Sequence, residues 1–427
     1  MTGQKGKWEI VNRCLLLIAF FYVVLFPTSV DGVISDNMWM PKNILAFAVV
    51  LYIVFKNGVN RTPFIIALLL VGLLMLLTLT TYLLGESSDL KVAYASVSAF
   101  ASTIVMWCIT FRDTEISEKF IKIFLNVFSA LLCIWGLGLA WNNEFAVTFT
   151  QTWFSQLTED MFENMILIRG KPVMSFGTHS MAAFFLLVVY FFNCIMIREK
   201  KNSFLQYIYL GIFIYLEFCL RSNTALLAIA AMFFLLIWAK NNILTRMFLT
   251  IVVIIVVYNM VKSGYVEELL SYILQNPQAD KHGLEGRYFS GMFDGNFEMA
   301  SKYFGVGFLR SQTDYFDMHD SGIIYIFTQG NIPAFVMSYF LMYYFLRRNL
   351  NAHYNKIFIL FFVWEIISAS TFISVKMIFA QVLTIFIINN LCRKKETGDM
   401  EIRRRSGSSR YGIWRYHGFE QSLRFRR

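Results

Sequence analysis

The chain has 427 residues, of which 57% are hydrophobic and only 15% are charged. A water-soluble domain of this length carries more charge, because polar groups must cover its surface, so the composition excludes an ordinary soluble fold. The formal net charge is +10, but much of the excess lies in short loops and a C-terminal tail, which argues against a nucleic-acid partner.

Long apolar runs recur along the chain, and most reach the roughly 20 residues that a membrane-spanning helix needs. The last run, 357–391, is too long for one tilted helix, and its polar stretch 368–371 and Lys376 divide it into two short ones. The sequence therefore predicts an all-α membrane protein with about 12 transmembrane helices. The predicted spans are 12–29, 42–56, 63–84, 91–111, 121–141, 179–197, 205–220, 223–240, 246–262, 322–346 and the two parts of 357–391.

Lysine and arginine residues orient these spans. With the N-terminus in the cytoplasm, every short basic loop falls on the inner side, as the positive-inside rule requires. We therefore expect a multi-pass protein of the bacterial inner membrane with both termini cytoplasmic. Its parts are a transmembrane domain, 1–392, and a basic cytoplasmic tail, 393–427. The inner basic residues include Lys56, Arg112, Lys200, Lys240 and Arg347.

Two long segments, 142–178 and 263–321, then face the periplasm. The larger one is predicted to be partly helical, because apolar residues recur at helical spacing from Val266 to Leu274. A second amphipathic stretch, 292–304, ends at Gly305, which is a typical helix stop.

Basic residues are scarce in these outer segments. Segment 263–321 has nine acidic residues and four basic ones, among them Arg287 and Arg310, while 142–178 contains Arg169 and Lys171. An outward arginine either binds an anion such as a lipid phosphate or pairs with a nearby carboxylate, and the sequence leaves both roles open.

Four charged residues fall in or beside the spans. Arg221 follows Glu217 by four residues, a spacing that suits mutual neutralisation or a guanidinium held toward a site between helices. Glu365 and Lys376 are expected to pair, because burying either charge alone is costly.

Two histidines stand where an outer segment meets a span. His319 precedes Asp320 and Ser321 and suits either acid–base chemistry or a helix-capping turn. His179 opens the sixth span directly after Gly177-Thr178. No phosphate-binding loop, dinucleotide fingerprint or metal-ligand motif is present in the sequence, so neither a cofactor nor a metal is predicted.

Several short motifs together resemble one family, the Wzy-type polysaccharide polymerases and their O-antigen ligase relatives. A Ser-Arg-x-Ala-Leu motif of that family is approximated at 220–227, although here the arginine precedes the serine and asparagine takes the usual arginine position. The C-terminal motifs are Gly286-Arg287, Phe304-Gly305-Val306-Gly307-Phe308, His319-Asp320-Ser321-Gly322-Ile323-Ile324-Tyr325 and Gly330-Asn331-Ile332.

The resemblance implies a fold like that of the C-type membrane glycosyltransferases and a reaction without metal or nucleotide sugar. The enzyme would join undecaprenyl-diphosphate-linked oligosaccharide repeat units at the periplasmic face. Its partners would be this lipid-linked substrate, the bilayer, a chain-length regulator and a repeat-unit flippase. The implied catalytic residues are Arg287 at the diphosphate and His319 or Asp320 as the base. The implied substrate-binding residues are Arg169, Arg221, Arg310 and His179.

Two other functions fit the same features. An O-antigen ligase would transfer the glycan to the lipid A core. A lipid-linked oligosaccharide flippase or transporter would also need many spans and outward arginines, but it should show two related halves. Because the sequence shows no such halves and its polar residues concentrate outside, an enzyme acting at one face is favoured.

The predicted topology can be tested with a reporter that is active only in the periplasm. Fusions near Asn143 or Asp280 should be active, and fusions near Lys200 or Arg348 should be inactive, because loop cations are retained in the cytoplasm. An active fusion at Lys200 would contradict the predicted orientation.

Overall fold

The computed structural model describes eleven segments and a few single residues between them, all within the unit Met1–Cys392. The segments are 2–25, 39–83, 90–111, 114–153, 163–168, 170–176, 179–201, 204–234, 304–308, 322–350 and 375–392. In these residues every regular element is a helix, and β pairing is limited to an isolated bridge between Val59 and Ile109.

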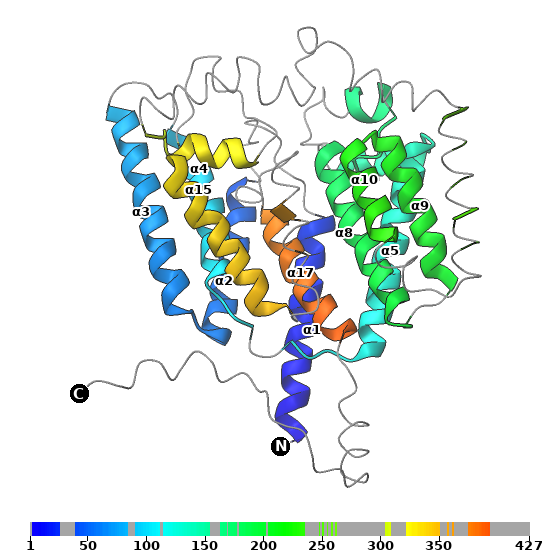
Figure 1. Cartoon of the computed structure of the whole chain (residues 1–427), viewed down its shortest axis with the longest axis horizontal. Helices are drawn as coiled ribbons and strands as arrows, with labels where there is room; N and C mark the ends of the chain where they lie inside the picture. The colour runs from blue at the N-terminus through cyan, green and yellow to red at the C-terminus, as the bar shows by residue number, and fades with distance from the viewer. Residues whose placement is uncertain are drawn as a thin grey trace. The chain divides into compact units, whose positions relative to one another are not determined.

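The helices occupy most of the ranges predicted as spans (Figure 1). The ninth predicted span, 246–262, and the first part of 357–391 contain only scattered described residues. The helical stretches predicted from Val266 to Leu274 and over 292–304 lie outside the described residues except for Phe304. Helix α6 and the π-helical turn η1 were not predicted. The elements are α1 (Thr2–Val24), α2 (Trp39–Asn57), α3 (Arg61–Leu83), α4 (Leu90–Trp107), α5 (Glu118–Ala140), α6 (Glu144–Trp153), η1 (Glu163–Ile168), α8 (His179–Arg198), α9 (Phe204–Leu220), α10 (Asn223–Met232), α15 (Gly322–Asn349) and α17 (Val375–Leu391).

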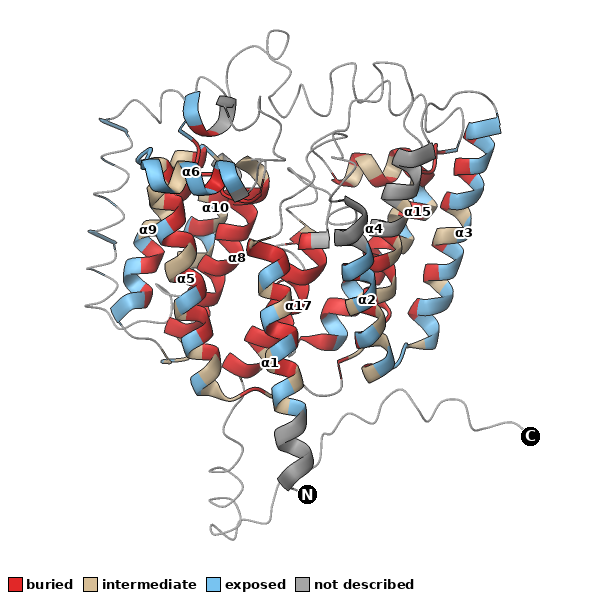
Figure 2. Ribbon diagram, turned by 180° about the vertical axis from the view of Figure 1, so that it is seen from behind, coloured by how far each residue is buried: buried red, intermediate tan, exposed pale blue. Residues whose placement is uncertain are grey.

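Three of these helices, α3, α5 and α8, are long and apolar enough to cross a membrane. Helix α3 buries Leu70 and Leu74 against its neighbours but exposes 62% of Leu69 and 61% of Leu76. Figure 2 shows the exposed residues along the free side of this helix. A leucine-rich face of this kind is unfavourable in water and typical of contact with lipid.

The helices pack in two groups that are joined by α17. Helix α4 contacts α2, α3 and α15 in one group, while α5, α8 and α9 contact one another in the other group. Helix α17 contacts α15 and α4 of the first group and α8 and α5 of the second (Figure 1). It also packs along α1.

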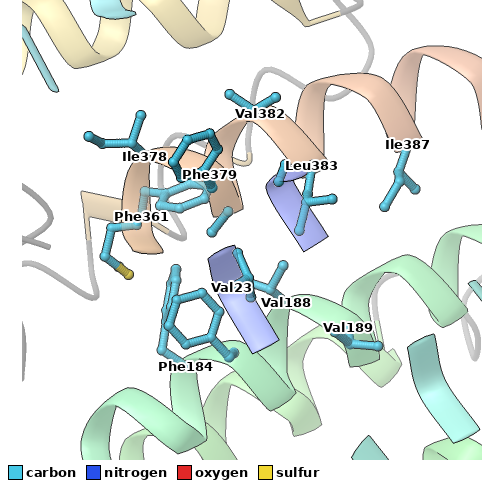
Figure 3. Close-up of a cluster of buried hydrophobic side chains, with 14 of the residues drawn as sticks. Val23, Phe184, Val188, Val189, Phe361, Ile378, Phe379, Val382, Leu383 and Ile387 are labelled. Carbon is cyan, nitrogen blue, oxygen red and sulfur yellow. The ribbon is translucent and has the colours of Figure 1, made fainter. Parts of the chain in front are cut away.

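A buried apolar cluster joins α1, α8 and α17. Figure 3 shows side chains of Val23, Phe184, Phe379 and Leu383 gathered there, and each of them is at most 1% exposed. Tyr22 stacks on Phe379 with ring centroids 4.4 Å apart. Because α8 and α17 are apolar on nearly every side, both lie inside the bundle.

Asparagines from three helices hold the connection between α4 and α5. Asn349 of α15 accepts a hydrogen bond from the Phe111 amide (2.7 Å) and donates one to the Ile109 carbonyl (3.0 Å). Asn390 of α17 accepts a hydrogen bond from the Ile116 amide and donates one to the Thr114 carbonyl. Asn12 of α1 donates to the Glu115 carbonyl, which lies between them. These side chains provide partners that buried backbone groups require, and they tie α1, α15 and α17 to one connection.

Candidate functional site

The described residues include two of the predicted site residues, His179 and Arg221. His179 is the first residue of α8 and is partly buried. The other five predicted site residues lie outside the described residues: Arg169, Arg287, Arg310, His319 and Asp320.

Arg221 does not form the helical pair with Glu217 that their spacing of four residues suggested. Helix α9 ends at Leu220, and Arg221 is exposed with a left-handed φ of 54°. Glu217 is completely buried, and neither of its carboxyl oxygens accepts a hydrogen bond from the described part of the chain. The mutual neutralisation of Glu217 and Arg221 is therefore not formed, because the backbone leaves the helix before Arg221.

The most distinctive local feature is a break in α15. Gly330 (φ −156°, ψ 25°) and Asn331 (φ 55°, ψ −156°) are both non-helical. The amide of Ile332 donates to the side-chain oxygen of Asn331 (2.8 Å) instead of continuing the helical hydrogen bonds. Pro333 follows and has no N–H group to donate. In a regular helix the amide groups at positions 332 and 333 would donate to the carbonyls four positions earlier, those of Thr328 and Gln329. Here both carbonyls lack this donor from their own helix.

A short segment that precedes α15 in the sequence provides the missing donors. We call residues 304–308 the glycine turn. Its Val306 amide donates to the Thr328 carbonyl (3.1 Å), and its Gly307 amide donates to the Gln329 carbonyl (2.9 Å). An unpaired carbonyl in an apolar bundle costs several kcal/mol, so this exchange of donors is what allows α15 to break there.

The glycine turn is also fixed against α3 and α4. The Phe308 amide donates to the hydroxyl of Thr78 on α3 (2.9 Å). The Phe308 ring lies edge-to-face with Phe100 of α4, with centroids 5.2 Å apart. The turn is therefore held by α3, α4 and α15 together.

Glycine is required at two positions of this turn. Gly305 has φ 114°, and a Cβ there would lie 2.5 Å from the Gln329 carbonyl oxygen. Gly307 has φ 65°, and a Cβ there would lie 2.6 Å from the Leu74 carbonyl oxygen and closer still to Thr78. Any other residue would meet both backbone strain and a collision with backbone atoms.

Polar side chains are buried around the break. Thr328 and Gln329 are 6% and 4% exposed, and Thr328 bonds back to its own helix. The side-chain oxygen of Gln329 accepts no hydrogen bond from the described part of the chain.

A second turn, residues 170–176, precedes α8 and is buried from Lys171 to Phe176, and we call it the lysine-bound turn. Lys376 donates from Nζ to the Ser175 carbonyl (2.9 Å) and hydroxyl (3.0 Å). The sequence placed Lys376 in an interruption between two helices, but it is the second residue of α17. Its predicted partner, Glu365, lies outside the described residues.

Comparisons with known protein families, with curated proteins and with solved structures find no match for this chain. Sequence reasoning identified the glycine motifs but missed Thr78, Pro333 and Ser175. Pro333, directly after Gly330-Asn331-Ile332, was the available signal, since proline inside an apolar span leaves a carbonyl without its donor.

The seating of the glycine turn can be tested by adding one methyl group. Gly307→Ala should destabilise the folded protein by about 2 kcal/mol or more, because the new Cβ collides with backbone at a left-handed position. Thermal unfolding in detergent would show a lower midpoint. Gly72→Ala on α3 is the control, since its Cβ meets open space. An unchanged midpoint for Gly307→Ala would contradict the described turn.

Proposed function

We propose that the chain is a metal-independent membrane glycosyltransferase that polymerises undecaprenyl-diphosphate-linked oligosaccharide repeat units into a surface polysaccharide. In this proposal it crosses the bacterial inner membrane about 12 times, with both termini in the cytoplasm and the reaction at the periplasmic face. The observation that carries the proposal is the contact between the glycine turn and the break in α15. Both segments belong to the motifs on which the family resemblance rests.

The proposed reaction is a displacement at an anomeric carbon. The acceptor hydroxyl oxygen attacks C1 of the sugar on the lipid diphosphate, the bond from C1 to the phosphate oxygen breaks, and undecaprenyl diphosphate leaves. His319 or Asp320 would take the hydroxyl proton. Arg287 would bind the diphosphate, whose charge grows as the bond breaks, through a planar fork that holds two phosphate oxygens.

The two buried turns support this assignment through the chain positions that adjoin them. Arg169 directly precedes Gly170 of the lysine-bound turn, and Arg310 follows Phe308 of the glycine turn by two residues. A catalytic loop works best when a rigid scaffold fixes the backbone on which it begins. Arg169 and Arg310 are therefore proposed to bind the diphosphate or the glycan, and Arg221 and His179 are proposed for the same role from the family resemblance.

A lipid-linked oligosaccharide flippase or transporter is the second candidate, and two observations favour it. Transporters build substrate sites from broken helices, and α15 is broken at Gly330 and Asn331. Ionisable residues buried among helices are also typical of transport pathways, and Glu217 and Lys376 are at most 1% exposed. Ligation to the lipid A core would use the polymerase chemistry with a different acceptor.

Substitution of Arg287 tests the proposed enzyme in cells. Arg287→Ala should abolish polymer and leave single repeat units, and Arg287→Lys should recover only a small part, because lysine keeps the charge but loses the bidentate fork. Polysaccharide length is measured at equal protein levels, with Lys302→Ala as the control in the same segment. Full-length polymer from Arg287→Ala would remove this arginine from the mechanism.

A further inference from the structure

The lysine-bound turn is buried although its backbone forms no regular ladder. Val173 is 1% exposed, and Met174, Ser175 and Phe176 are completely buried. Two hydrogen bonds close the turn internally, from the Val173 amide to the Lys171 carbonyl (2.8 Å) and from the Phe176 amide to the Val173 carbonyl (3.0 Å). Met174 adopts a left-handed φ of 50°. Such a turn needs external partners, because buried backbone groups must be hydrogen-bonded.

Lys376 provides such a partner from 201 positions away in the sequence. Its side chain is 1% exposed, and the ammonium contacts both the carbonyl and the hydroxyl of Ser175. The same Nζ lies 4.6 Å from the ring centroid of Phe176, a distance at which a cation and an aromatic face attract. Phe176 in turn stacks on Phe185 of α8, with centroids 4.6 Å apart. The lysine thus joins α17, the turn and α8.

We infer that Lys376 is a positioning residue that holds the lysine-bound turn in its substrate-binding shape at the start of α8. This inference rests on the proposed function. The turn is followed along the chain by His179, one of the proposed substrate-binding residues, and preceded by Arg169. If the turn were not held, substrate binding would have to order it, and that loss of conformational freedom would weaken affinity.

The first measurement follows the turn itself and needs no activity. A thiol introduced as Val173→Cys should be protected from maleimide in the purified protein, because this position is 1% exposed. It should become reactive when Lys376→Met is added and stay protected with Lys376→Arg, which keeps the charge and the N–H donors. The protein without the added cysteine gives the background from its six native cysteines.

The control is another buried polar side chain on the same helix. Gln381 accepts a hydrogen bond from the Trp107 indole (2.6 Å) and is completely buried, but its bond leads to α4. Gln381→Leu should lower the thermal midpoint while leaving Val173→Cys protected. This control distinguishes a general loss of helix packing from a specific release of the lysine-bound turn.

The second measurement is the affinity for undecaprenyl diphosphate, determined in nanodiscs with the sugar-free lipid as the probe. Lys376→Met should raise the Kd about tenfold, and Lys376→Arg and Gln381→Leu should leave it within about twofold. If Lys376→Met does not accumulate, Ser175→Ala takes its place, with a smaller rise expected because the lysine keeps the carbonyl bond.

Two results would overturn the inference. Val173→Cys protected equally in Lys376→Met would show that the lysine does not hold the turn. A reactive thiol with an unchanged Kd would show that the turn has no part in binding. Failure of the proposed function is distinct, since the unaltered protein would then form no polymer or not bind the lipid, while the maleimide measurement would still decide whether Lys376 holds the turn.

Discussion

The exchange of hydrogen-bond donors at the break in α15 is the interaction on which the rest of the structure depends. Asn331 and Pro333 remove two donors from the helix, and Val306 and Gly307 of the preceding glycine turn replace them. The replacement works only because an unpaired carbonyl among apolar helices is so costly that the turn must stay docked. One local irregularity thereby fixes residues 304–308 against α3, α4 and α15.

The lysine-bound turn and the glycine turn follow the same physical plan in the two segments that the sequence predicts to face outward. In each, a short irregular backbone stretch is buried, and polar groups from distant helices satisfy it: Lys376 for one turn, Thr78 and the break in α15 for the other. The connection between α4 and α5 is held similarly by Asn12, Asn349 and Asn390. The apolar helices form a scaffold, and a few buried polar contacts set the backbone of its connections.

Much of the helical framework could be predicted from sequence, because length and hydropathy alone decide whether a segment suits a bilayer. The partners of individual side chains and turns could not be predicted in this way. Lys376 was expected to pair with a nearby charge, whereas in the structure its ammonium donates a hydrogen bond to the backbone carbonyl of Ser175. The pairing of Arg221 with Glu217 was one of two roles considered from helical spacing, and that spacing fails where φ becomes positive. Gly305 and Gly307 were recognised as a motif, but their geometric reason depends on Gln329 and Thr78, which are distant in the sequence.

The most direct test of the proposed function reconstitutes the purified protein in liposomes with an undecaprenyl-diphosphate-linked repeat unit. Product length, released undecaprenyl diphosphate and movement of the substrate across the bilayer are measured in one preparation. The account predicts oligosaccharides longer than the substrate, with undecaprenyl diphosphate released for each new linkage. Passage of the unaltered lipid-linked repeat across the bilayer, with no longer product, would contradict it and establish a transporter.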